Sequence, residues 1–167
     1  MRNVALRLVG VALALACLVA VTAADATRSD SAKDELRSAR YVYISSTRKD
    51  GSLGKPAEIW FFSQDGAVYV GTGAGSWRVR RIKAGRPQAK IWVGKPNGPS
   101  MFDASDADLK DLSSFEATGS VVEDEKIREA LFKAFAEKYP DGWPKHEEGF
   151  RTGFKDGSRV LVKYAPK

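Results

Sequence analysis

The chain has 167 residues, of which 43% are apolar and 29% are charged, and it carries a formal net charge of +6. This composition is typical of one globular domain, and the small basic excess favours anionic ligands without reaching the composition of a nucleic-acid-binding protein. The single cysteine, Cys17, and the single histidine, His146, exclude a disulfide framework and a His-rich centre, so we predict no metal site.

Residues 1–26 have the layout of a secretory signal peptide. Arg2 and Arg7 form a positive start, residues 8–20 are an uninterrupted apolar run, and small residues follow. We therefore predict that residues 27–167 form a periplasmic or secreted domain, without stable membrane contact once the leader is cleaved. The alternative is an uncleaved membrane anchor, because residues 8–24 reach the lower length limit of a membrane-spanning helix.

The first half of the mature chain predicts a short helix near residues 34–39 and then antiparallel strands. Residues 41–47 are rich in β-branched and aromatic side chains. Residues 57–62 predict a second strand, which is apolar on both faces except for Glu58. An Asp-Gly turn at residues 65–66 then leads into a returning strand over residues 67–70.

A run of small residues, Gly71 to Ser76, precedes a basic helix that we expect from Gly75 to Lys83. A glycine-rich loop that opens a helix presents free backbone N–H groups to an anion. Ser76 adds a hydroxyl, and Arg78, Arg80 and Arg81 add positive charge. The stretch therefore predicts a phosphate-binding site.

The second half predicts further strands and one clear helix. Residues 88–93 and 115–122 have strand character, whereas residues 124–139 carry apolar side chains at helical spacing. We expect residues 150–154 and 159–164 to form a hairpin across a Lys-Asp-Gly-Ser turn. The sum is a mainly β (α+β) domain, in which about six antiparallel strands form a split β-barrel with two or three flanking helices.

The order of these elements resembles the FMN-binding split barrel of the pyridoxamine 5'-phosphate oxidase-like proteins, including their deazaflavin-dependent relatives. Residues 47–51 resemble the first hairpin of that family, and residues 56–61 its aromatic second strand. Thr72 with residues 75–80 is similar to the phosphate-binding loop and helix start, and residues 115–139 resemble the next strand and helix. The resemblance covers most of the mature chain.

The resemblance implies a flavin-type cofactor, FMN or a deazaflavin, at the interface of a homodimer. Carried onto this sequence, it implies that Thr72, Ser76 and Arg78 bind the phosphate, beside Trp77, which stands where some members have a second basic residue. It also implies that the isoalloxazine ring lies along Glu58, Ile59, Trp60 and Phe61.

Three functions follow from these observations. The first is an exported flavin-dependent oxidoreductase that acts on a small-molecule substrate, in which the cofactor performs the redox chemistry. The second is a non-catalytic module on the same fold that binds a small ligand, either flavin or haem; for the cofactor, the alternatives to FMN are a deazaflavin or none. The third is a protein that binds nucleic acid or an anionic surface through the basic residues from Arg78 to Arg86, and it is disfavoured by export and by the modest charge. The sequence identifies no catalytic acid or base.

Overall fold

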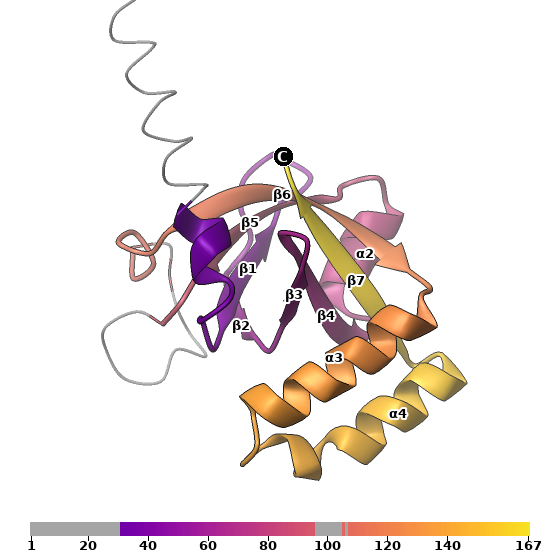
Figure 1. Cartoon of the computed structure of the whole chain (residues 1–167). Helices are drawn as coiled ribbons and strands as arrows, with labels where there is room; N and C mark the ends of the chain where they lie inside the picture. The colour runs from indigo at the N-terminus through magenta and orange to yellow at the C-terminus, as the bar shows by residue number, and fades with distance from the viewer. Residues whose placement is uncertain (1–30, 96–104, 106) are drawn as a thin grey trace, which may run out of the picture.

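The computed structural model describes residues 31–95, 105 and 107–167, which form one curled antiparallel sheet with helices packed on it (Figure 1). The predicted signal peptide lies outside the described residues. The sheet has seven strands in the order β2-β1-β5-β6-β7-β4-β3. The strands are β1 (Val42–Ser46), β2 (Ala57–Ile59), β3 (Phe62–Gln64), β4 (Ala67–Gly73), β5 (Gln88–Val93), β6 (Ser114–Val122) and β7 (Arg159–Pro166).

One continuous segment brings the two ends of the sheet together. β2 and β3 are the terminal strands of the sheet, yet only Trp60 and Phe61 separate them in the chain. This connection curls the sheet into the split barrel that the sequence predicts. The strand predicted over residues 57–62 divides here into β2 and β3. Because residues 150–154 are not a strand, the sheet has seven strands, where about six were expected. Tyr139 satisfies the backbone at the break, since its hydroxyl accepts a 3.1 Å hydrogen bond from the Phe61 N–H and donates one of 2.7 Å to the Arg40 carbonyl.

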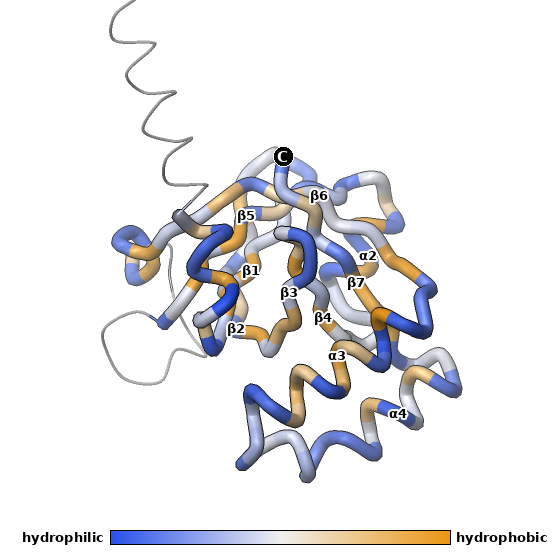
Figure 2. Tube along the Cα trace, in the orientation of Figure 1, coloured by the Kyte–Doolittle hydropathy of each residue, from blue (hydrophilic) through white to orange (hydrophobic). Residues whose placement is uncertain are grey.

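Strand alternation sorts the apolar side chains into an inner core on one face of the sheet and two separate clusters on the other, the smaller of which contains Tyr43, Trp92 and Leu109. Figure 2 shows apolar residues, in orange, recurring along β5 and β7. The inner core lies inside the curl, where helix α2 (Trp77–Lys83) adds Val79. It includes Val42, Ile44, Phe61, Val68, Val70, Ile91, Val162 and Tyr164.

The outer cluster lies between the convex face of the sheet and the C-terminal helices. These are α3 (Glu125–Lys138), the 3-10 turn η1 (Trp143–Lys145) and α4 (Glu147–Asp156). The predicted helix over residues 124–139 is confirmed, and Asp124 caps it by accepting a 3.1 Å hydrogen bond from the Ile127 N–H. Members of the cluster include Tyr69, Leu131, Phe132, Phe135, Tyr139, Trp143 and Leu161.

The predicted hairpin between residues 150–154 and 159–164 is wrong, because residues 150–154 lie within α4. Phe150 and Phe154 are four residues apart, so on a helix both face the outer cluster. Glu147 and Glu148 place negative charge in the first turn, and Gly157 ends the helix with a left-handed φ of 77°.

The small-residue run also differs from the prediction. Gly71, Thr72 and Gly73 are the end of β4, where they pair with Leu161, Val160 and Arg159 of β7. Only residues 74–76 remain as a connection to α2. The side chain of Thr72 is therefore fixed by a strand and not by a loop. Among the described residues, no helix has the length and apolar character needed to cross a membrane.

Candidate functional site

The three residues predicted to bind a phosphate lie together at the junction of β4 and α2. The guanidinium of Arg78 donates a 2.9 Å hydrogen bond to the Thr72 hydroxyl, which in turn donates to Ser76 Oγ at 3.4 Å. Arg78 and Thr72 are almost fully buried, at 8% and 7% exposure. We call Thr72, Ser76 and Arg78 the anion cluster.

Arg78 is a buried cation without a carboxylate partner. No Asp or Glu in the described part of the chain forms an ion pair with it, and its Nε is buried without a hydrogen-bond partner. The buried hydroxyl of Tyr164 lies close enough to interact electrostatically and also lacks a partner. Burial lowers the pKa of Arg78, because the charged form has lost its hydration. A buried unpaired charge is costly, so this arrangement favours an external anion.

Trp77 orders the arginines instead of extending the anion cluster. Its ring centroid lies 5.0 Å from Arg78 Cζ and 4.9 Å from Arg81 Cζ, within the range of cation–π attraction. Arg81 also donates a 2.5 Å hydrogen bond to the Ser46 carbonyl.

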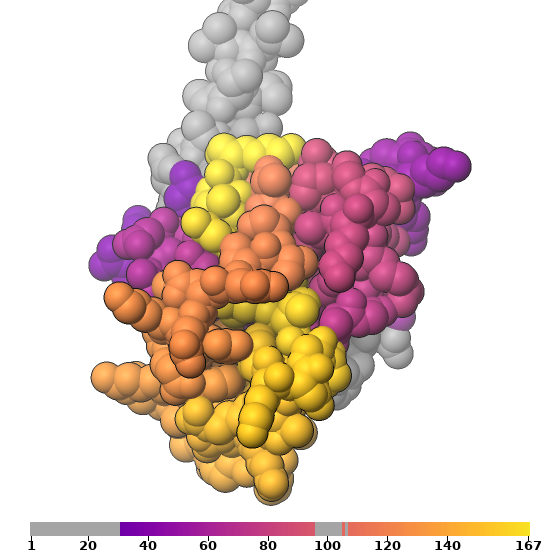
Figure 3. Space-filling view, turned by 90° about the vertical axis from the view of Figure 1, so that its right-hand side faces the viewer, coloured from indigo at the N-terminus to yellow at the C-terminus, as the bar shows by residue number. Residues whose placement is uncertain are grey.

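Arg80 is exposed and binds the Gly75 carbonyl. Figure 3 shows the surface of α2, in magenta, beside β6. Because α2 has only seven residues, attraction for an anion depends on Arg78 and not on the helix end.

Glu58 is held on the outer face of the sheet by Tyr43. The two residues are directly paired across β2 and β1, and the Tyr43 hydroxyl donates a 2.5 Å hydrogen bond to Glu58 Oε2. Tyr43 is fully buried, and burial followed by the hydrogen bond to Glu58 raises the pKa of its hydroxyl. The hydroxyl therefore stays protonated and acts as a fixed donor to the carboxylate.

A hollow of about 270 Å³ lies beside Glu58 on the outer face. Trp60 forms its aromatic wall and is locked in place by stacking on Tyr139, with ring centroids 4.4 Å apart and an interplanar angle of 7°. His146 contacts Trp60 edge-on, at a centroid distance of 5.6 Å. The hollow is lined by Glu58, Ile59, Trp60, Gly71, His146 and Phe150.

The hollow and the anion cluster lie on opposite faces of one stretch of β4. Gly71 lines the hollow, whereas its neighbour Thr72 belongs to the anion cluster. Successive strand residues are only about 3.3 Å apart, so the two sites are adjacent along the chain. β3 pairs with β4 only over residues 67–69, and no described strand pairs with residues 70–73 on that side. An open strand edge therefore separates the two sites.

The four residues predicted to lie along a flavin ring do not all share one face of the sheet. Glu58 and Trp60 reach the hollow, and Ile59 lines it in part while also packing against the inner core. Phe61 is 0% exposed and lies in the inner core. The connection between β2 and β3 turns Trp60 toward the hollow and Phe61 into the inner core, so Trp60 is the one of these two aromatic side chains that can contact a ligand directly.

Lys138 covers Phe61 and provides a pH-dependent test of this packing. Its Nζ lies 3.6 Å from the ring centroid, and burial lowers the pKa of Lys138 to about 8. Between that value and the usual lysine pKa, the folded state binds fewer protons than the unfolded state, so stability rises with pH. We expect the free energy of unfolding to increase by about 1–2 kcal/mol from pH 7 to pH 10, after allowance for partial exposure and the cation–π contact.

Urea unfolding of the wild type and of Lys138→Met at both pH values measures this effect. We expect the methionine variant to be the more stable protein at pH 7 and to lack this part of the pH dependence. An identical pH dependence in the two proteins would show that the Lys138 amine is not desolvated by the fold.

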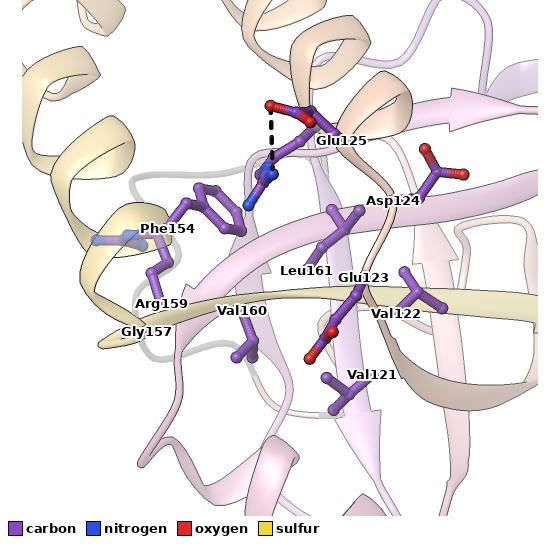
Figure 4. Close-up of a pocket in the computed structure, with 11 residues that line it drawn as sticks. Val121, Val122, Glu123, Asp124, Glu125, Phe154, Gly157, Arg159, Val160 and Leu161 are labelled. Carbon is purple, nitrogen blue, oxygen red and sulfur yellow. Dashed lines mark ion pairs between the residues drawn. The ribbon is translucent and has the colours of Figure 1, made fainter.

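A second hollow, of about 390 Å³, lies where β6 meets α3 and where α4 meets β7 (Figure 4). Its wall carries three carboxylates, Glu123, Asp124 and Glu125, and two guanidinium groups, Arg128 and Arg159, of which Arg128 already pairs with Glu125 at 3.9 Å. The carboxylates outnumber the guanidinium groups, which disfavours a phosphate, and no predicted site residue lines this hollow. In the described ranges, no three His, Cys, Asp or Glu side chains gather in a way that could hold a metal ion.

The structure also brings in residues that the sequence did not single out for a site. Tyr43 orients Glu58, Tyr164 lies beside Arg78, and His146 and Phe150 line the hollow. Strand register could have suggested Tyr43, because it is the residue opposite Glu58 in the observed pairing. No local signal could have placed His146, which is far from Trp60 in sequence and is positioned by the turn between η1 and α4.

No protein-family model and no curated protein sequence matches the chain. Solved structures do match its fold. A protein from Listeria innocua assigned to the pyridoxamine 5'-phosphate oxidases has a TM-score of 0.53 and 16% identity, over 83% of this chain and 93% of that one. The haem storage protein HutZ from Vibrio cholerae has a TM-score of 0.57 and 13% identity, over 81% and 87% of the two chains.

General stress protein 26 from Bacillus anthracis is similar in the same way, with a TM-score of 0.51 and 19% identity, over 80% of this chain and 88% of that one. At these identities the likeness shows a shared fold. The neighbours are pyridoxamine 5'-phosphate oxidase-like proteins, so the resemblance inferred from the sequence is confirmed at the level of the fold.

Proposed function

Because the chain has the split-barrel fold of the pyridoxamine 5'-phosphate oxidase-like proteins, we propose that it binds a flavin-type nucleotide, FMN or a deazaflavin, and serves as an oxidoreductase. The observation that carries the proposal is Arg78, a buried guanidinium with no carboxylate partner and an unsatisfied Nε at the position predicted for a phosphate. The bound cofactor would supply the electron or hydride transfer.

The donor set of the anion cluster fits a phosphate monoester. A guanidinium offers several N–H groups in a planar fork, which matches phosphate oxygens and binds them more strongly than a neutral donor does. The hydroxyls of Thr72 and Ser76 already lie in a hydrogen-bonded row with Arg78 and can turn their protons toward an added anion. These side chains would hold and orient the ligand and would transfer no proton.

The hollow beside Trp60 fits the ring of the same ligand. It lies one residue along β4 from the anion cluster, and the open edge at residues 70–73 gives a path between the two faces. A hollow on the outer face is shallow in a single chain, so we propose that a second copy of the chain covers the ring. The proposed assembly is a homodimer that binds a small-molecule substrate.

Reconstitution with FMN tests the proposed function. Protein from residue 27 onward is incubated with FMN, desalted and examined by absorbance spectroscopy. We expect flavin bands that remain with the protein, and bleaching of these bands by a nicotinamide or other reductant that leaves free FMN unchanged on the same timescale. Loss of all flavin from folded protein would contradict an FMN site, and the same assay with a deazaflavin would then decide between the two cofactors.

The second candidate is a module on the same fold that binds its ligand without turnover. One neighbour of similar fold is a haem storage protein. His146 is the only imidazole in the chain, it is exposed, and it lies at the hollow against Trp60. A haem Soret band that is lost in His146→Ala, together with no retained flavin, would support this candidate over the oxidoreductase.

We also propose that the protein acts outside the cytoplasm. The proposal rests on the positive start and apolar run of residues 1–26. An exported protein that crosses the membrane unfolded must acquire a cofactor after export. Mass spectrometry of the protein isolated from its native cells would find a mature N-terminus between residues 24 and 27 if the leader is cleaved, and residue 1 if it is kept.

A further inference from the structure

One carboxylate oxygen of Glu58 receives no hydrogen bond from the described residues. Its side chain lines the hollow, and among the described residues no Lys, Arg or His forms an ion pair with it. Its one hydrogen bond among those residues is the 2.5 Å contact from Tyr43 to Oε2. A carboxylate accepts several hydrogen bonds and donates none, so Oε1 of Glu58 can still accept a hydrogen bond from an N–H or O–H group of a ligand.

The direction of this acceptor is fixed by the sheet. Tyr43 and Glu58 are directly opposite in the β1–β2 register, which places both side chains on the outer face. Tyr43 is fully buried and packs with Trp92 and Leu109. Because the hydroxyl cannot move away from this packing, it holds one oxygen of Glu58 and leaves the carboxylate in one orientation.

Trp60 provides a flat surface beside that carboxylate. Its ring is fixed by the stacked contact with Tyr139 and by an edge contact with Phe135 at 5.9 Å. A methyl group at Gly142 would lie only 2.8 Å from the Trp60 ring, which shows how closely the backbone supports it. A rigid indole next to an oriented acceptor fits a planar ring with an N–H group on its edge.

We propose that Glu58, held by Tyr43, is the residue that determines ligand specificity in the hollow, by accepting a hydrogen bond from a ring N–H of a planar heteroaromatic group stacked on Trp60. The inference rests on the proposed function, because the ring belongs either to the bound nucleotide or to a separate substrate. It deepens that proposal by naming the chemistry that is recognised, an imide or lactam N–H, and the side chain that recognises it.

Lumichrome tests the inference, because it is a flavin ring with N–H groups and without the ribityl phosphate. Its fluorescence is titrated with the folded protein and compared with that of its N,N'-dimethyl derivative, which stacks equally well but has no N–H. We expect the methylated ring to bind about 10- to 100-fold more weakly, since a hydrogen bond to a charged acceptor is lost. Equal affinity for the two rings, or no binding of lumichrome, would overturn the inference.

Glu58→Gln is the matched protein variant. Its carbonyl can still accept from the Tyr43 hydroxyl, so the fold is kept, but its NH₂ group then faces the ring N–H. We expect this variant to lose the preference for lumichrome over the methylated ring while its melting temperature stays near that of the wild type. A preference that survives in Glu58→Gln would assign the recognition to another group.

Two further arms separate this inference from the proposed function. Arg78→Met should leave lumichrome binding unchanged, because lumichrome has no phosphate. Competition between lumichrome and FMN would assign the hollow to the cofactor ring, whereas simultaneous binding would assign it to a separate substrate. Retention of FMN without discrimination between the two lumichromes would retain the proposed function and reject the role of Glu58.

Discussion

Arg78→Met should lower the affinity for FMN by at least about 100-fold, because it removes the charged donor to the phosphate, and a charge-assisted interaction with a buried partner is worth several kcal/mol. The same change should leave the free energy of unfolding equal to or greater than that of the wild type. Arg78 has no carboxylate partner, so methionine replaces a buried unpaired charge with an apolar side chain of similar length. Fluorescence titration with FMN and urea unfolding measure the two effects.

Arg80→Met is the control for this prediction. Arg80 lies on the same helix but is exposed, and its guanidinium donates a hydrogen bond to the Gly75 carbonyl. The variant makes the same change in net charge, so we expect less than about a threefold change in FMN affinity. Similar losses in both variants would indicate general attraction by a basic surface, and no loss in Arg78→Met would place the phosphate elsewhere.

Tyr139→Phe should reduce the free energy of unfolding by about 2–4 kcal/mol, because it leaves two backbone groups without a partner. The Tyr139 hydroxyl accepts from the Phe61 N–H and donates to the Arg40 carbonyl, at the point where the chain passes from one edge of the sheet to the other. The ring itself stays, so its stacking on Trp60 and its packing against Phe135 are kept. Chemical denaturation, followed both by fluorescence and by a signal from secondary structure, measures the loss in the free energy of unfolding.

Tyr164→Phe is the matched control, since Tyr164 is equally buried but its hydroxyl forms no hydrogen bond to a described backbone group. Removal of an unsatisfied buried hydroxyl should change stability by less than about 1 kcal/mol and can increase it. Equal costs for the two substitutions would show that the loss comes from tyrosine-to-phenylalanine repacking and not from the backbone hydrogen bonds.

Much of the fold follows from the sequence because strands and amphipathic helices have local signals. The periodicity of residues 124–139 and the β-branched run at residues 41–47 each predicted the observed element to within about a residue or two. The errors arose where two periods compete. Phe150 and Phe154 are consistent with a strand or a helix over five residues, and the helix prevails because the outer cluster buries both rings on one side.

The division of the second strand could not be read from its residues. Trp60 and Phe61 have high strand propensity, but the closure of the sheet forces the chain to leave β1 and join β4 there. That tertiary requirement is met by Tyr139, whose hydroxyl supplies the partner that a strand neighbour would otherwise provide.

The candidate site was predictable where its residues are close in sequence. The family resemblance grouped Thr72, Ser76 and Arg78, which lie within seven residues of one another, and the structure brings them into one hydrogen-bonded row. The absence of a carboxylate partner for Arg78 among the described residues, and the pairing of Glu58 with Tyr43, depend on long-range packing and register. Sequence patterns do not determine these long-range features. The sequence therefore predicted that Glu58 contacts a ring, but it did not predict how the Glu58 carboxylate is oriented.

A comparison of FMN and riboflavin tests the central claim most directly, because the two ligands share the same ring and ribityl chain and differ only in the phosphate. Both are titrated into the mature protein at the same ionic strength. If Arg78, Thr72 and Ser76 hold the phosphate, FMN should bind at least about 100-fold more tightly than riboflavin, and this preference should disappear in Arg78→Met. Equal affinities in the wild-type protein would contradict a phosphate site at the anion cluster.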